Sequence, residues 1–348
     1  MKNLKIAYLS WGNSPCNYRR FSKFSELVWF KAELYDPSKK YDIIVVTQNS
    51  DLTTWSRFPV GGAKIIFDFV DSYLTINPFD LKSNLFGFAK FLKGQHRYLE
   101  WNYNNSIKRM ILRADAVVCS TPEQKQAYSV YHQNVFDILD FNQEQITVVK
   151  TSYFLGDTVH LAWEGMGSNA WAFQEIAPVL QRIHAKQPLA IHLVTDLKYK
   201  SHNGPLAWSY EVKQKLQNFL GKVPVYVYDW NSRMLPVICT QCDIALLPIP
   251  REPPIYWAKP ENRLLMLWRM GLPVLASANP AFQRCMQAAG NAEQACKTEK
   301  DWADKLEALI LSETLRRGSA ERGRIYGDEK VSETALSQKW MKVLESVL

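Results

Sequence analysis

The chain has 348 residues, of which 47% are hydrophobic and 22% are charged, and its formal net charge is +8. This length favours two domains with large buried cores, and the absence of any 18-residue apolar run excludes a membrane-spanning helix and leaves a soluble or peripheral protein. The basic balance suits an acidic partner, whether a nucleotide diphosphate, a nucleic acid or an anionic membrane, without choosing among them.

The first part of the chain alternates strand-like and helix-like stretches. Lys2 and Lys5 precede only a short apolar run at 6–9, which is too brief for a signal-peptide core, so we expect a first strand there. The predicted strands of this series lie near residues 4–9, 42–47, 64–70, 115–119 and 146–149.

Two carboxylates, Asp68 and Asp71, fall at the end of the strand predicted at 64–70. A spacing of three places them on opposite sides of the strand end, so only one need face a cleft. Such a carboxylate accepts the proton of an acceptor hydroxyl in an inverting transfer reaction. The alternative is that Asp71 or Ser72 caps the following helix.

Residues 79–93 have the pattern of an amphipathic helix. One face carries Leu81, Leu85, Phe88 and Leu92, and a separate face carries Lys82, Lys90 and Lys93 with Phe86 among them. Basic and aromatic residues continue after it, at His96, Arg97, Trp101, Lys108, Arg109 and Arg113. The lysine face with its aromatic residue is suited to an anionic lipid surface. The alternative is a helix that packs on its own domain and leaves its lysines in water.

The alternation then repeats, with strands predicted near 159–163, 190–195, 223–228, 244–247 and 273–276. Such alternation predicts right-handed crossovers, parallel sheets and ligand sites at the carboxyl ends of the strands. We place the domain boundary in the polar connection at 151–157.

A glycine-containing turn follows the strand at 159–163. Gly165 and Gly167 allow close backbone approach, Ser168 or Asn169 can cap a helix from about residue 170, and a phosphate fits on the amides of this turn. A lone GxG is a weak motif, and an ordinary strand-to-helix turn is the alternative.

The segment 242–277 carries the densest signals. A buried strand at 244–247 leads through a long loop to Pro260, which suits the first turn of a helix, and Gly271 ends that helix. Lys259, Asn262 and Arg263 gather at the helix start, where free N–H groups and the macrodipole favour a phosphate. The alternative is a solvated basic helix start.

Metal chemistry has no support in the sequence. The pair at Cys239 and Cys242 is a lone CxxC without a second pair, and the six cysteines of the chain are expected to be reduced thiols that pack. No HExxH spacing and no DxD triplet is present, so no metal site is predicted.

Three stretches of the last segment resemble the donor-binding region of GT-B glycosyltransferases, of the family 4 or family 1 type. They are CDIALLP at 242–248, KPENR at 259–263 and MGLPV at 270–274. In the retaining family that the chain most resembles, two glutamates lie eight residues apart, the second five residues before the glycine. Counting back from Gly271 puts Met266 and Ala258 at those positions, and Glu252 and Glu261, nine residues apart, do not restore the pair. The resemblance therefore implies the fold and the phosphate site but not the stereochemistry.

The resemblance implies two Rossmann-like α/β domains that face each other across a cleft. The acceptor domain would span 1–154, the nucleotide-sugar donor domain 155–330, and a C-terminal helix at 331–348 would return to the first domain. The implied nucleobase residues are Tyr228 and Trp230, with the buried core as the alternative place for Trp230. Arg251 and Glu252 would belong to a donor sugar loop.

The function implied is a cytoplasmic, metal-independent hexosyltransferase that moves a sugar from a nucleotide-diphosphate sugar to a glycan or lipid-linked acceptor. No cofactor is expected beyond this donor, and contact with the inner face of an anionic membrane is left open. Two alternatives remain: a nucleotide-sugar epimerase of the same fold, and a non-catalytic nucleotide-sugar or glycan-binding protein. Nucleic-acid binding is not expected, because no recognised module accompanies the basic charge.

Overall fold

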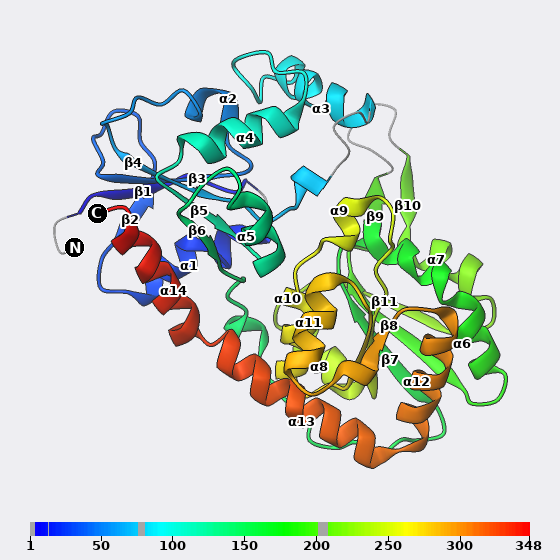
Figure 1. Cartoon of the computed structure of the whole chain (residues 1–348). Coiled ribbons are helices and arrows are strands. Elements are labelled where there is room, and N and C mark those ends of the chain that lie inside the picture. The colour runs from blue at the N-terminus through cyan, green and yellow to red at the C-terminus, as the bar shows by residue number, and fades with distance from the viewer. Residues whose placement is uncertain (1–3, 13, 76–80, 201–207) are drawn as a thin grey trace. The chain divides into compact units, whose positions relative to one another are not determined.

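The computed structural model of the chain describes residues 4–12, 14–75, 81–200 and 208–348, and for residues 75 and 81–84 it describes the backbone alone (Figure 1). The chain forms two compact units. The N-terminal unit comprises Met1–Phe141, Pro253–Pro260 and Val331–Leu348, and the C-terminal unit comprises Asn142–Glu252 and Glu261–Lys330.

The N-terminal unit is built on a six-stranded parallel sheet in the order β2-β1-β3-β4-β5-β6. Its strands are β1 (Ile6–Tyr8), β2 (Ala32–Leu34), β3 (Ile43–Thr47), β4 (Lys64–Asp68), β5 (Ala116–Cys119) and β6 (Val135–Asp137). Its helices are η1 (Pro15–Tyr18), α1 (Phe21–Leu27), α2 (Leu52–Trp55), η2 (Tyr73–Thr75), α3 (Leu81–Leu92), α4 (Tyr103–Arg113), α5 (Pro122–Tyr128), α9 (Pro254–Trp257) and α14 (Glu333–Ser346). The run Ile43–Thr47 is buried throughout, as expected for a strand that is covered on both faces.

The last helix, α14, belongs to the N-terminal unit and packs on α1. The indole ring of Trp340 is fully buried and lies 5.3 Å from the ring of Phe21 and 6.0 Å from that of Phe24, measured between centroids. Large aromatic side chains bury much apolar area, so these contacts fix the helix strongly. Asn134 adds a hydrogen bond of 2.9 Å to the hydroxyl of Ser346.

The C-terminal unit has a second parallel sheet, in the order β11-β8-β7-β12-β13-β14, and a small antiparallel pair of β9 and β10. Its strands are β7 (Val159–Glu164), β8 (Leu189–Thr195), β9 (Lys198–Lys200), β10 (Ser209–Glu211), β11 (Val225–Asp229), β12 (Ile244–Leu247), β13 (Val274–Ser277) and β14 (Ala295–Cys296). The first strand along the chain, β7, lies beside β12, and the order reverses there. This is the topological switch point of a doubly wound sheet, and ligands bind beside it at the carboxyl ends of the strands.

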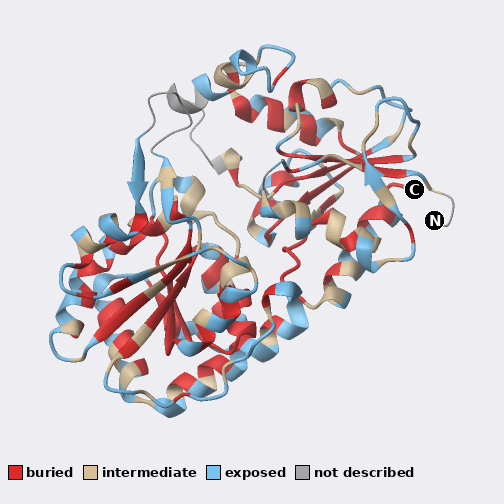
Figure 2. Ribbon diagram, turned by 180° about the vertical axis from the view of Figure 1, so that it is seen from behind, coloured by how far each residue is buried: buried red, intermediate tan, exposed pale blue. Residues whose placement is uncertain are grey.

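Helices flank this second sheet, and Figure 2 shows buried strands with exposed residues on the outer helix faces. They are η3 (Gln143–Gln145), η4 (Gly167–Glu175), α6 (Ala177–His184), α7 (Val212–Leu220), α8 (Met234–Gln241), α10 (Asn262–Arg269), α11 (Pro280–Ala288), η5 (Ala292–Gln294), α12 (Glu299–Leu311) and α13 (Glu313–Lys330). Helix α10 lies tightly against α13, since a Cβ placed on Gly323 would lie 2.5 Å from the buried ring of Trp268. Gly271, with a φ of +78°, ends α10 as predicted.

Nine of the ten predicted strands are confirmed to within a few residues. The tenth, at 146–149, is wrong: this segment is not a strand, and the amide of Lys150 donates to the carbonyl of Met270 within the C-terminal unit at 2.8 Å. Sequence reasoning also missed the short strands β2, β6, β9, β10 and β14. The chain passes from one unit to the other at Phe141, earlier than the connection at 151–157 that the sequence suggested.

The helix expected at 79–93 is present as α3, but its faces differ from the prediction. Leu85 and Leu92, expected to pack, are 53% and 68% exposed. Phe86 and Lys90, expected on the outer face, instead contact the buried ring of Tyr103, with the ammonium of Lys90 4.6 Å from its centroid. The side chains of Leu81 and Lys82 lie outside the described residues. In the described part of the chain, no helix is long and apolar enough to cross a bilayer.

Candidate functional site

The carboxyl end of β7 and the start of α10 meet in the C-terminal unit. Nη1 of Arg263 donates to the backbone carbonyl of Glu164 at 2.9 Å, and its guanidinium carbon lies 5.9 Å from the centre of the Trp163 ring. Burial lowers the pKa of Arg263, although the carboxylate of Glu164 opposes this. The two motifs that the sequence placed 98 positions apart, at Gly165 and Arg263 (263 − 165), are therefore adjacent.

Gly165 is required by this contact. A Cβ at position 165 would lie 2.6 Å from Nη1 of Arg263 and 2.9 Å from the Trp163 ring. Trp163 is fully buried, so its ring has little freedom to withdraw. Gly167 is similarly enclosed, since its Cβ would lie 2.7 Å from Val212. Both glycines permit the close backbone approach that the sequence suggested.

The capping prediction for this turn is wrong. Helix η4 begins at Gly167, its N-cap is Met166, and no side chain caps it. Ser168 and Asn169 lie inside η4, half-buried, and the amide of Asn169 bonds to the carbonyl of Met166 at 2.8 Å. The amide of Gly167 is taken by the carboxylate of Asp196, which follows β8, at 3.2 Å. A strand-to-helix turn without a polar N-cap explains why sequence reasoning misplaced the cap.

Helix α10 starts without a side-chain cap. Its N-cap, Glu261, is buried, and its carboxylate pairs with Arg284 at 2.7 Å and does not accept from the helix amides. Asn262 is the first residue of the helix, and Arg263 follows it. A helix end without a side-chain acceptor retains the positive end of its dipole for an anion.

Lys259 belongs to the N-terminal unit, in the segment Pro253–Pro260. Its ammonium pairs with Oδ1 of Asp71 at 2.6 Å. Nε2 of Gln48 donates to the other oxygen of this carboxylate at 3.0 Å, and Oε1 of Gln48 accepts from the amide of Asp71 at 3.1 Å. Burial raises the pKa of Asp71, but the charge of Lys259 and the hydrogen bonds from Lys259 and Gln48 outweigh burial and lower it overall.

Asp68 has a different environment from Asp71. Its carboxylate is fully buried in an ion pair with Arg20, whose Nε donates to it at 3.3 Å. Arg20 is also fully buried and donates to the carbonyl of Ile138 at 2.6 Å and to Asp140 at 3.2 Å. A paired and fully desolvated carboxylate of this kind orders the chain around it and offers no surface to a substrate.

The two aromatic residues predicted for a nucleobase lie differently. Trp230 follows β11, is half-buried, and its Nε1 donates to Oε1 of Glu164 at 3.0 Å. It therefore contacts the same residue as Arg263. The hydroxyl of Tyr228 bonds to Nδ1 of His192 at 3.0 Å, on the face of the sheet. The buried residue Glu164, which sequence reasoning did not select, links Trp230 to Arg263, and its place directly before the glycine turn was the available signal.

The remaining predicted residues are on an exposed loop. Arg251 and Glu252 are both exposed, and Nη2 of Arg251 donates to the carbonyl of Lys297 at 2.6 Å.

The six cysteines are free thiols, five of them buried. In residues 4–12, 14–75, 81–200 and 208–348, no group of three or more His, Cys, Asp or Glu side chains has a metal-binding arrangement.

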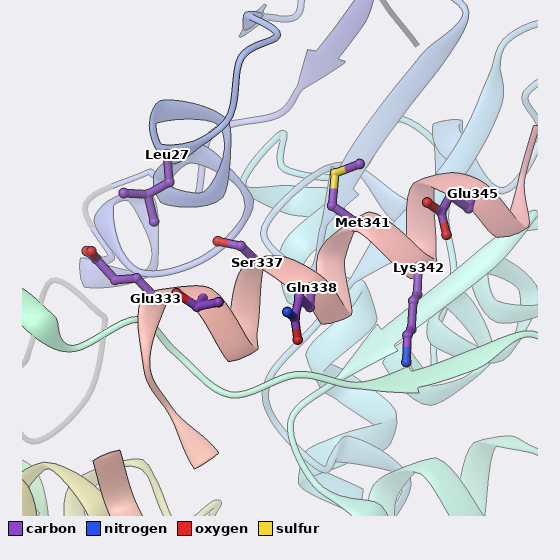
Figure 3. A pocket seen from close by; sticks show the side chains of 8 residues that line it. Leu27, Glu333, Ser337, Gln338, Met341, Lys342 and Glu345 are labelled. Atoms are coloured by element: carbon purple, nitrogen blue, oxygen red, sulfur yellow. The ribbon is translucent and has the colours of Figure 1, made fainter. Parts of the chain in front are cut away.

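Two surface hollows lie away from these residues. One, of about 590 Å³, follows α14 in the N-terminal unit, where the helix presents its polar side chains (Figure 3). It is lined by Leu27, Glu333, Thr334, Ser337, Gln338, Met341, Lys342 and Glu345. The other, of about 460 Å³, lies beside α7 and is lined by Ser209, Tyr210, Glu211, Gln214, Lys215, Asn218 and Phe219. Neither is lined by a predicted site residue.

Comparison with known proteins gives a likeness in structure alone. No protein-family model matches the chain, and no curated protein matches it in sequence. Sucrose-phosphate synthase from Thermosynechococcus elongatus superposes with a TM-score of 0.60 at 13% identity, over 88% of this chain and 73% of that one. WaaG, a glycosyltransferase involved in lipopolysaccharide biosynthesis, has a TM-score of 0.53 at 10% identity, over 97% of this chain and 98% of its own.

TarM has a TM-score of 0.58 at 11% identity over 86% of this chain, which spans about half the length of TarM, with 54% covered. A mutant of S. aureus TarM, similar at 12% identity, is in complex with fondaparinux, alpha-GlcNAc-glycerol and UDP. Identities this low show the fold and no more. With its two parallel six-stranded sheets, the chain has the GT-B fold of these glycosyltransferases.

Proposed function

We propose that the chain is a glycosyltransferase of the hexosyltransferase type, which moves a sugar from a nucleotide-diphosphate sugar to a glycan or lipid-linked acceptor. The observation that carries this proposal is the contact of Arg263 with the turn at Glu164 and Gly165, beside the switch point of the C-terminal sheet. A basic side chain, a glycine turn and an uncapped helix start at this place suit a diphosphate.

In the proposed donor site, Arg263 and the N-terminus of α10, with Asn262, stabilise the diphosphate. Nη1 of Arg263 is held by Glu164, and among the described residues its remaining N–H groups make no further hydrogen bond. The turn at Gly165, Gly167, Ser168 and Asn169 would bind the phosphates. For the amide of Gly167 to donate to a phosphate, its hydrogen bond to the carboxylate of Asp196 would have to break. Bound UDP in the TarM complex makes a uridine diphosphate donor the first to test.

For the rest of the donor we propose that Trp230 borders the nucleobase, because its half-buried ring is anchored on Glu164. We assign Tyr228 a supporting role, since its hydroxyl is used by His192. Arg251 and Glu252 are proposed for the sugar loop because they follow β12 on the same unit.

Transfer breaks the bond between the anomeric carbon and a phosphate oxygen and forms a bond to the acceptor hydroxyl. The nucleoside diphosphate leaves with additional negative charge, which a cation and a helix N-terminus stabilise. The hydroxyl proton must go to a base, and of the two predicted carboxylates we assign this role to Asp71. Its side chain is 23% exposed, whereas Asp68 is fully buried against Arg20. We propose a metal-independent reaction, because the sequence contains no DxD triplet of the kind that would hold a metal on a sugar nucleotide.

A thermal-shift panel of nucleoside diphosphates and their sugar conjugates tests this proposal. A ligand at 100 times its dissociation constant stabilises the folded state by about 2.7 kcal/mol. Release of free sugar from the best conjugate, without acceptor, supports a transferase. An epimerised nucleotide sugar would indicate the epimerase, and binding without turnover for every acceptor would indicate a binding protein.

Chelation tests the metal-independent part of the proposal. Turnover is expected to survive EDTA. Loss of turnover that manganese or magnesium restores would contradict it.

A further inference from the structure

The N-terminal unit exposes an apolar surface that the proposed transfer reaction does not use. It is made by α3 and the segment 98–101 that follows it, and we call it the α3 face. Its exposed members include Leu85, Leu92 and Trp101, with 53%, 68% and 54% of their surface accessible. The others are Phe86, Phe91, Tyr98 and Leu99. Scattered single apolar residues need no explanation, but seven exposed ones between residues 85 and 101 do.

Contacts of α3 with the chain that follows it fix the orientation of this helix. A Cβ placed on Gly87 would lie only 2.0 Å from the carbonyl oxygen of Glu100, so the helix backbone rests directly on that segment. The ring of Phe88 stacks on that of Trp101 at 4.7 Å, and Phe86 meets the edge of Tyr103 at 5.4 Å. Leu85 and Leu92 are seven residues apart on one stripe of the helix, which at 100° per residue lies opposite Gly87 and beside Phe88.

The surroundings of the α3 face are basic. Between residues 81 and 113 the sequence has seven Lys and Arg residues and one acidic residue, Glu100, which pairs with Arg109 at 2.9 Å, while Asp80 lies just before this range. Lys93 and Arg97 are exposed beside the apolar residues. The guanidinium carbons of Arg57 and Arg97 lie 4.3 Å and 5.7 Å from the centre of the Tyr98 ring. This combination complements a negatively charged surface with an apolar interior.

We propose that the α3 face binds an anionic lipid bilayer, with Leu85 and Leu92 entering the acyl boundary. Tyr98 and Trp101 have the amphipathic rings that occur at headgroup depth, and Lys93 and Arg97 reach anionic headgroups with their long side chains. Of the lysine face that sequence reasoning assigned to lipid, Lys93 keeps this role, and the leucine stripe takes the place of Phe86 and Lys90. This inference is independent of glycosyl transfer.

The experiment is co-sedimentation of the full chain with phosphatidylcholine vesicles, with and without phosphatidylglycerol. The test variant is Leu85→Ser with Leu92→Ser. Its control is Val60→Ser with Val130→Ser, two other aliphatic residues of the same unit that are 90% and 80% exposed. We expect the wild type and the control to bind anionic vesicles alike and the leucine variant to bind at least about tenfold more weakly.

The charge arm uses Lys93→Glu, with Lys40→Glu as its control because Lys40 is exposed in the same unit. Lys93→Glu is expected to weaken binding about fivefold or more, and added salt to weaken binding of the wild type. Thermal melting confirms that each variant is folded.

Equal binding of wild type and leucine variant overturns the proposal, as does equal binding to neutral and anionic vesicles. Self-association without vesicles that the leucine variant abolishes also overturns it, because the α3 face would then be an interface between copies of the chain.

Discussion

Arg263 donates from Nη1 to the carbonyl of Glu164 at 2.9 Å, and this bond joins the N-terminus of α10 to the carboxyl end of β7. It connects residues 99 positions apart, on two strand-to-helix units that flank the switch point of the sheet. The bond holds a cation where a doubly wound sheet binds its ligands. It also explains why position 165 has no side chain.

Gly165→Ala is expected to destabilise the C-terminal unit by about 1 to 3 kcal/mol, because the added methyl group would overlap Arg263 and the buried Trp163 ring. Chemical denaturation measures this change. The control is Gly156→Ala, where the methyl group would meet no atom within 4 Å and stability should change by less than about 0.5 kcal/mol. Equal stability of the two variants would mean that the turn has room for a side chain.

The pH dependence of stability should reflect His192. Burial, reinforced by His160, lowers its pKa to about 4 from the value of about 6.5 expected in the unfolded chain. The folded state therefore prefers the neutral ring. The contribution of His192 to the free energy of unfolding is complete above pH about 6.5 and is lost as the pH falls toward about 4. His96, whose pKa burial and then Lys90 also lower to about 4, acts in the same direction.

Urea denaturation between pH about 7 and about 4.5 tests this prediction. The midpoint of the wild type should fall with pH, and His192→Gln should show a smaller fall, whatever its stability at neutral pH. If the urea midpoint of His192→Gln fell with pH as much as that of the wild type, His192 would be excluded as the titrating group.

Much of the fold could be predicted, because buried parallel strands are short, continuous apolar runs. The strand at 244–247 was predicted with its observed bounds, Ile244–Leu247, and its buried pattern is complete. The missed strands are different: β2 is largely exposed, and the hairpin strands β9 and β10 carry charged and aromatic residues. Such short edge segments have no apolar run to reveal them.

The motifs of the candidate site could be predicted from the sequence, but the contacts that their side chains make could not. Position in the α/β pattern selected Gly165 and Arg263, whereas the hydrogen bond that Arg263 donates to the neighbouring Glu164 depends on tertiary packing. Lys259 lay three residues from Asn262 in the motif, yet its charge is held by Asp71, far away in sequence. The faces of α3 were misjudged because Gly87, with no side chain of its own, decides which side packs.

Asp71→Asn should lower kcat by about 10² to 10⁴ and leave donor affinity unchanged if Asp71 accepts the proton of the acceptor. The stability cost should be at most about 1 kcal/mol, since the ion pair with Lys259 is partly exposed on both sides. Steady-state kinetics with the substrates found by the thermal-shift panel measure the change.

Asp137→Asn is the control for this experiment, because it breaks a pair with Lys339 elsewhere on the same unit. If both variants kept the activity of the wild type, the base would have to be another group.

The most direct test of the account is titration of the wild type, Arg263→Ala and Arg233→Ala with a nucleoside diphosphate by calorimetry. Arg233 is an exposed arginine at another helix start, the N-cap of α8 in the same unit. Loss of a charge-assisted contact should cost Arg263→Ala about 1.5 to 3 kcal/mol, or roughly 10- to 150-fold in affinity, and Arg233→Ala should bind like the wild type. Equal affinity of Arg263→Ala and the wild type would place the diphosphate elsewhere and contradict the proposed donor site.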